Sequence, residues 1–193
     1  QLSQVLRYGA LPVTLNIAES TSISPTLGQD QLSAGLLAGA IGLGLVVLYL
    51  IIYYRALGFV AVFSLIVAAA FLWLYIVALG RTIGFTLTLA GIAGAIVAIG
   101  ITADSFVVYF ERIRDEIRDG KSLRVATELA WVRARRTLLA ADFVSLLAAF
   151  VLYSLSVGSV RGFAFTLGLT TLIDVFVAFW FTHPLVTYFG KSK

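Results

Sequence analysis

The sequence contains no cysteine and no methionine, and its 193 residues include only one histidine and three prolines. The absence of thiols excludes disulfides, thiolate metal sites and cysteine nucleophiles. A single histidine likewise leaves no material for a histidine-rich metal site. Charged residues make up 12% of the chain, whereas a soluble domain has about 25%. These deficits exclude a soluble globular domain, a disordered tail and a nucleic-acid-binding module. Because residue 1 is glutamine, we expect the chain to be part of a longer protein.

Apolar residues are abundant where charge is scarce: 60% of the chain is hydrophobic, and the mean hydropathy is +0.99. A transmembrane helix needs about 20 mostly apolar residues. Five stretches meet that length, at residues 32–52, 57–79, 84–110, 138–157 and 163–188. Only helices and closed barrels satisfy their backbone inside lipid, and short links make neighbouring spans antiparallel. The sequence therefore predicts an all-α membrane protein with a five-helix bundle at 31–193.

The net charge of +4 is better explained by orientation than by nucleic-acid binding. Arg55, the basic residues of 112–136, Lys191 and Lys193 give eleven positive charges on one side of the predicted bundle. Arg7, Arg81 and Arg161 give the other three of the fourteen. Loops rich in Lys and Arg stay in the cytoplasm. We expect a membrane protein with an extracytoplasmic N-terminus and a cytoplasmic C-terminus.

Residues 1–30 do not resemble a membrane span. The segment 12–17 alternates with period two, which is typical of a strand, and 20–31 is a polar linker with Pro25 and Gly28. We interpret 1–30 as the end of an extracytoplasmic domain and its linker. A disordered N-terminal tail is the alternative.

The charged stretch 111–136 predicts a cytoplasmic loop in two parts. Glu111 to Asp119 continues the third span, Gly120 and Lys121 interrupt it, and Ser122 is placed to cap a second, amphipathic helix that ends near Arg136. Two interpretations stay open for that helix. It can lie on anionic lipid, or it can bind a cytoplasmic partner.

Three carboxylates lie within the predicted spans: Asp104, Asp142 and Asp174. An Asp at the centre of a transmembrane helix costs roughly 2.5–3.5 kcal/mol on insertion scales. The sequence places no Lys or Arg deep in any span to offset this cost. Protonating a carboxylate at neutral pH costs a similar amount, about 4 kcal/mol. Such a group can therefore load and release a proton, which makes these acids candidate proton-coupling residues.

Small and hydroxyl residues accompany each acid. Asp104 has Gly100 one turn before it and Thr102 and Ser105 beside it, Asp142 has Ser145 on its face, and Thr170 precedes Asp174 by one turn. This pattern predicts a polar path inside the bundle, with no metal site. For each Asp, a purely structural hydrogen bond is the alternative.

The segment 91–122, GIAGAIVAIGITADSFVVYFERIRDEIRDGKS, closely resembles the fourth-helix signature of the SecD family of protein-export membrane proteins. That signature is a glycine-rich helix with an Asp near its cytoplasmic end and a Phe-Glu-Arg-Ile-Arg run ending in Gly-Lys-Ser. The segments 141–143 and 158–168 also resemble the following two helices of the family. The resemblance covers essentially the whole chain.

The resemblance implies a bundle of the resistance–nodulation–division superfamily that works with SecF and the SecYEG channel on preproteins. The SecD-like subunit and SecF would together use the proton gradient, with sodium as the alternative coupling ion. No other cofactor is expected. The family's proton-carrying Asp falls on Asp104, and its fifth-helix Asp falls on Asp142. Asp174 departs from the apolar or hydroxyl residue that is usual in the family, which leaves its role open.

The expected function is therefore an ion-gradient-driven subunit of the protein-export machinery, without ATPase activity of its own. Expected partners are SecF, SecYEG, a preprotein held by the missing extracytoplasmic domain, and membrane lipids, but no nucleic acid. Two alternatives remain. One is a small-molecule or lipid exporter of the same superfamily, and the other is a membrane scaffold without ion coupling.

Overall fold

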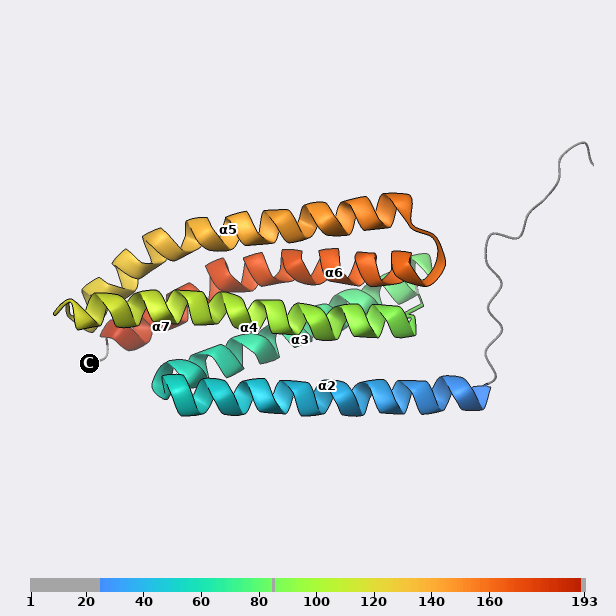
Figure 1. Cartoon of the computed structure of the whole chain (residues 1–193), viewed down its shortest axis with the longest axis horizontal. Coiled ribbons are helices and arrows are strands. Elements are labelled where there is room, and N and C mark those ends of the chain that lie inside the picture. The colour runs from blue at the N-terminus through green and yellow to red at the C-terminus, as the bar shows by residue number, and fades with distance from the viewer. Residues whose placement is uncertain (1–24, 85, 192–193) are drawn as a thin grey trace, which may run out of the picture.

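The computed structural model describes residues 25–84 and 86–191, and all regular structure in these ranges is helical. This confirms the all-α prediction. The helices, shown in Figure 1, are α2 (Pro25–Tyr54), α3 (Ala56–Ile83), α4 (Leu89–Arg118), α5 (Leu123–Leu155), α6 (Gly158–Val177), the π-helix η1 (Ala178–Thr182) and α7 (His183–Lys191).

Five of the helical stretches are long and apolar enough to cross a membrane. They are Leu32–Tyr54, Ala56–Thr82, Leu89–Arg118, Leu123–Leu155 and Gly158–Phe189. Each contains one of the five spans expected from hydropathy, or nearly all of it. The chain is therefore a multi-pass membrane protein.

Two of the helices run further than the hydropathy predicts. The expected amphipathic helix and the fourth span form one continuous helix, α5, because residues 123–155 contain neither glycine nor proline to interrupt it. The helix α2 begins at Pro25, inside the segment expected to be a linker. Proline is well tolerated in the first turn, where its missing N–H costs nothing. The strand expected at 12–17 lies outside the described residues.

The last span changes its winding where it meets a proline. Pro184 has no N–H to donate, and just before it the N–H of His183 bonds the carbonyl of Ala178, five residues back. The helix nonetheless continues through α7 to Lys191. The single turn of π-helix lets the span pass Pro184 without ending.

Short turns join the helices, and their residues suit them. Gly84 closes α3 at φ 68°, Gly120 follows α4 at φ 83°, and Gly158 opens α6 at φ 58°. Glycine adopts this left-handed region at little cost. Thr88 caps α4 by accepting the Gly91 N–H at 3.1 Å. Gly120 lies at the break that the sequence predicts, and Ser122 occupies the N-cap of α5.

The end of the bundle that carries Arg55 and the α4–α5 turn is called here the basic end. Glu116 is 2% exposed and pairs with Lys121 and Arg133, which ties the end of α4 to the start of α5. Tyr54 donates to Glu111 at 3.0 Å and thereby joins α2 to α4. These bonds hold the helix extensions together beyond the apolar spans.

A hydrophobic core fills the bundle near the basic end. It centres on Tyr109 and Phe110 of α4, and Trp131 of α5 packs on Tyr109 and stacks on His183 of α7. Figure 1 shows α4 running through the middle of the bundle, with α2 at its edge. Since α4 contacts α2, α3, α5 and α6, it has few faces left uncovered.

Near the opposite end, α4 and α6 approach closely at Gly94. A Cβ built on Gly94 would lie 2.7 Å from the hydroxyl oxygen of Thr166 and 2.8 Å from the carbonyl oxygen of Phe163. The second contact is with backbone, so it cannot be relieved by a side-chain rotation. Small residues permit such close helix packing in membranes.

We expect Gly94→Ala to destabilise the bundle by about 1–3 kcal/mol, the usual cost of overpacking. Gly42→Ala is the matched control, because a Cβ at Gly42 meets nothing within 4 Å. Thermal unfolding of the purified protein in detergent measures both. A Gly94→Ala midpoint equal to that of Gly42→Ala would contradict the close approach.

Candidate functional site

The polar residues of α6 share one face, and that face points into the bundle. Thr166, Thr170 and Asp174 follow at four-residue spacings on α6, and Thr182 lies eight residues after Asp174, in η1. Each is at most 8% exposed. Thr182 reaches α3, where its hydroxyl lies 2.9 Å from that of Ser64. Thr170, the threonine expected beside Asp174, is therefore an interior group. The sequence analysis does not single out Ser64. Its position as a serine within the apolar second span could have indicated an interior polar contact.

Asp174 is the centre of this face and is 2% exposed. The hydroxyl of Ser105 on α4 donates to its Oδ2 at 3.3 Å, and it also lies 3.2 Å from the Ile101 carbonyl. Thr102, one turn earlier on α4 and 5% exposed, lies beside the same carboxyl group. Two hydroxyls predicted to accompany Asp104 thus serve Asp174 instead.

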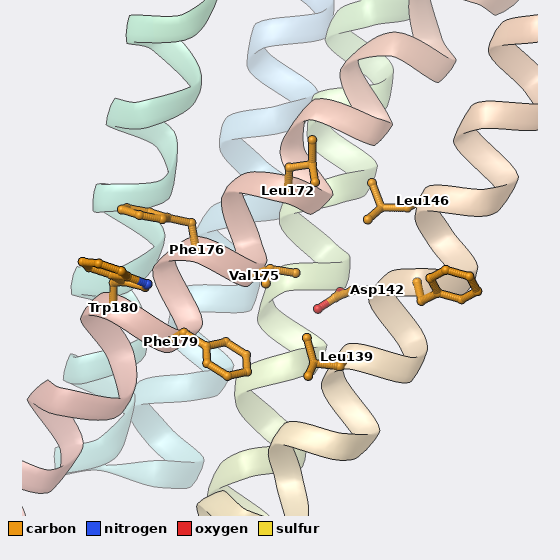
Figure 2. A pocket seen from close by; sticks show the side chains of 9 residues that line it. Leu139, Asp142, Leu146, Leu172, Val175, Phe176, Phe179 and Trp180 are labelled. Atoms are coloured by element: carbon orange, nitrogen blue, oxygen red, sulfur yellow. The ribbon is translucent and has the colours of Figure 1, made fainter.

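Asp142 approaches from α5 and is 4% exposed. Figure 2 shows its carboxyl group directed between α5 and α6, toward Val175. It lies in a groove of about 610 Å³ whose other walls are apolar and aromatic, including Phe143 and Phe179. Ser145, its predicted neighbour, is only half-buried. Asp142 and Asp174 each keep one oxygen, Oδ1, buried and without a hydrogen-bond partner among the described residues.

Asp104 lies on a different face of α4. Its side chain is exposed on this chain, as are Gly100 and Val97 at the preceding turns. The next residue, Ser105, is buried against Asp174. A step of one residue turns a helix by about 100°, so the two side chains lie on different faces of α4. Two of the three predicted acids, Asp142 and Asp174, are therefore buried in the bundle, whereas Asp104 is exposed.

The surface of α4 that contains Val97, Gly100 and Asp104 is called the Asp104 face. Among the described residues, no Lys, Arg or His forms an ion pair with Asp104. The ion pairs of the described chain all lie at the basic end. A Cβ on Gly100 would meet nothing within 4 Å. An uncovered carboxyl group on an apolar span is costly in lipid, so this face is suited to a protein partner.

A small cavity is bordered by Thr102, which lies beside Asp174. It measures about 20 Å³ and lies among α3, α4 and α6, with Thr102 and Thr170 as its polar walls. In the part of the chain that the structure describes, no three His, Cys, Asp or Glu side chains gather as a metal site.

The model of the family "Protein export membrane protein SecD/SecF, C-terminal" matches residues 9–192. The chain belongs to the SecD/SecF family. Its SecD-type signature surrounds Asp104, in α4, and the family match extends over every helix described above. The expectation drawn from segment 91–122 is thereby confirmed.

Named relatives support the same assignment. The chain is 60% identical over 192 residues to the protein translocase subunit SecD of Streptomyces coelicolor and 53% identical over 193 residues to that of Mycobacterium tuberculosis. In both cases all of this chain is covered, but only 34% of the relative. The chain thus spans about a third of the length of the SecD subunits it matches.

Solved structures of SecDF share the fold. The crystal structure of SecDF from Thermus thermophilus, a translocon-associated membrane protein, matches with a TM-score of 0.83 and 37% identity, over 99% of this chain and 26% of that one. A second SecDF structure, in a super-membrane-facing form, matches with a TM-score of 0.78 and 38% identity, over 97% and 25% of the two chains. The five-helix bundle of this SecD/SecF member is therefore that of the SecDF membrane region.

Cross-linking can test whether Asp104 and Ser105 lie on different faces of α4, because the chain has no cysteine of its own. We expect cysteines at Ser105 and Asp174 to be joined by a short bifunctional thiol reagent, since their side chains are in contact. Cysteines at Asp104 and Asp174 should not be joined. Gel mobility after digestion between α4 and α6 measures both. Equal cross-linking of the two pairs would contradict the placement of Asp104.

Proposed function

We propose that the chain is the membrane portion of a SecD subunit that uses the proton motive force to promote preprotein translocation across the bacterial plasma membrane. Membership of the SecD/SecF family and the likeness to SecDF support the export role. The observation that carries the coupling role is the position of Asp104, an exposed carboxyl group within an apolar span.

Asp104 is the group that would take up a proton from outside and release it inside. Its face on α4 is uncovered in this chain, so a second protein must shield it from lipid and can control its access to water. One charge that crosses 100 mV yields about 2.3 kcal/mol. Several protons in each cycle would therefore supply enough energy to move a domain. Sodium in place of the proton is the alternative coupling ion.

SecF is the proposed partner at the Asp104 face, and the family resemblance supports this pairing. The complex would associate with SecYEG, and the preprotein would be held by an extracytoplasmic domain joined to α2. We propose no ATPase activity for the subunit, because its energy comes from the ion gradient. Lipids would cover the exposed apolar faces of α2 and α3.

The distribution of charge supports an orientation with the basic end in the cytoplasm. Arg55 and the α4–α5 turn lie at that end, whereas Arg161 lies at the opposite end with the turn that opens α6. Positive loops stay in the cytoplasm. The N-terminus would then be extracytoplasmic and the C-terminus cytoplasmic.

The relatives' names favour protein transport over the export of small molecules or lipids. All the similar proteins reported above are named as SecD subunits or SecDF. An exposed Asp104 in an apolar span costs free energy of membrane insertion. A scaffold without ion coupling would not need a carboxyl group at this position. We therefore keep export coupling as the proposed function.

We expect Asp104→Asn in the full-length SecD–SecF complex to abolish both proton uptake and the stimulation of preprotein translocation by an imposed proton gradient. Asparagine keeps the shape of the side chain but cannot exchange a proton. Translocation into inverted membrane vesicles and a pH-sensitive dye inside them measure the two effects.

Asp115→Asn is the control, because Asp115 is a 59% exposed acid on the same helix at the basic end and should leave both signals unchanged. If Asp104→Asn retains gradient-dependent translocation and proton uptake, the proposed coupling role is wrong. If translocation responds only to a sodium gradient, the coupling ion is sodium.

A further inference from the structure

The groove of about 610 Å³ between α5 and the helices α6 and η1, called here the α5–α6 groove, is not explained by the proposed function. Figure 2 shows Leu139 and Leu146 on its α5 side and Phe176 and Trp180 on its other side. Trp180 is 75% exposed, so the groove is open to the surroundings of the bundle. Asp142 belongs to the lining but is only 4% exposed. The surface that a ligand would meet is therefore mainly apolar.

The length of the α5–α6 groove matches one leaflet of a membrane. Its α5 wall extends from Leu139 to Leu146, which is about 10 Å at 1.5 Å per residue. The hydrocarbon of one leaflet is about 15 Å deep, half of the bilayer's about 30 Å. A smaller groove of about 250 Å³ begins at Leu146 and Leu172 and continues toward the opposite end. The α5–α6 groove therefore belongs to the leaflet at the basic end, and its size suits acyl chains.

Two arginines lie where the groove meets the basic end. The α5 residues that line the groove follow the helical spacing of three and four, and Arg135 and Arg136 continue this face one turn before Leu139. One turn before Arg135, Trp131 contacts Phe179 of the groove wall, with ring centroids 4.9 Å apart. Arg135 therefore lies between Trp131 and Leu139 on the side of α5 that faces η1.

Both of these arginines are exposed, and neither forms an ion pair or a hydrogen bond among the described residues. Arg133, by contrast, pairs with Glu116. The acids of α5, Glu128 and Asp142, each lie seven residues from Arg135, which is about 10 Å along the helix. An arginine guanidinium can bind a phosphate through two parallel hydrogen bonds. The two arginines are therefore available to an anion from outside the chain.

We propose that Arg135, Arg136 and the α5–α6 groove form a binding site for an anionic phospholipid of the leaflet at the basic end. The phosphate would lie at the two arginines, and the acyl chains would lie in the groove. Cations at the end of an apolar groove match a molecule with an anionic head and an apolar tail.

The continuity of α5 specifies how the lipid is bound. Because α5 runs unbroken from Leu123 to Leu155, the lipid would bind along the side of a membrane-spanning helix. It would not lie beneath a separate amphipathic helix. In the proposed orientation the basic end is cytoplasmic, and the cytoplasmic leaflet carries the anionic lipids. The inference uses that orientation and does not depend on the coupling role of Asp104.

Quenching of tryptophan fluorescence by brominated lipids tests the site in the full-length SecD–SecF complex, reconstituted in mixtures of phosphatidylglycerol and phosphatidylcholine. The part of the quenching that Trp180→Phe removes reports on the groove, because Trp180 lines it. We expect phosphatidylglycerol to bind there about five- to 25-fold better than phosphatidylcholine, from about 1 kcal/mol for each arginine. Equal quenching by the two lipids would overturn the proposal. Quenching by neither would mean that protein covers the groove, which would also overturn it.

Charge variants test the headgroup position in the same assay. We expect Arg135→Gln and Arg136→Gln each to lower the preference for phosphatidylglycerol by up to about fivefold, and the double variant to remove it. Arg118→Gln is the matched control, because Arg118 lies at the basic end on α4 and its side chain is 67% exposed. The control should keep the preference. An equal loss in Arg118→Gln would indicate only the general surface charge and would overturn the site.

A variant of the groove wall tests where the acyl chains lie. Val175 lines the groove and is half-buried, so Val175→Phe would fill part of the groove without changing the charge. We expect weaker binding of phosphatidylglycerol. Val160→Phe is the control, because Val160 is exposed on α6 and lines neither groove. Unchanged binding in Val175→Phe would overturn the placement of the chains.

Lipid preference is measured without a proton gradient, so this inference and the proposed function can fail separately. If Asp104→Asn keeps gradient-dependent translocation while the wild type prefers phosphatidylglycerol, the coupling role fails and the lipid site stands. If Asp104→Asn abolishes coupling but the wild type shows no lipid preference, the lipid site fails and the proposed function stands. Thermal unfolding checks that each variant is folded, and the wild-type preference decides the proposal in any case.

Discussion

The structure depends on one constraint: inside a membrane, a polar group must find its partner within the protein, because no bulk water is available. The backbone meets this requirement by forming helices. The threonines and serines meet it largely by bonding carbonyls one turn earlier, as Thr170 and Thr171 do on α6. The three carboxyl groups cannot meet it in that way, since an ionised carboxylate has no hydrogen to give. Their positions therefore carry most of the functional information in this chain.

The acids on the two sides of helix α4 have different surroundings: Asp142 and Asp174 are buried, whereas Asp104 is exposed. On its inner side, Ser105 and Thr102 face Asp174, and Asp142 completes a buried group of acids and hydroxyls. On its outer side, Asp104 remains uncovered beside Gly100. Close packing of α4 on α6 at Gly94 holds the inner arrangement in place. The buried acids and the exposed acid thus face the same shortage of hydrogen-bond donors in different surroundings.

The basic end shows a different balance. There the helices extend beyond the apolar spans, and Glu116 is buried but paired with Lys121 and Arg133. A buried charge with partners fixes geometry, whereas a buried charge without one can exchange a proton. The α4–α5 connection thus serves as a firm joint, and the aromatic contact of Trp131 with His183 extends it to α7.

The sequence by itself determined the five spans, the break at Gly120 and the presence of three acids in apolar surroundings. These are local properties, set by hydropathy, by the conformational freedom of glycine and by the charge of single residues. It also predicted that Thr170 lies one turn before Asp174 on the same face, since the helical period is fixed. It did not determine which helix covers each face of α4, and so it grouped Ser105 and Thr102 with Asp104. Only the tertiary structure decided that grouping, because neighbours across a bundle depend on how distant helices pack and not on spacing along one of them.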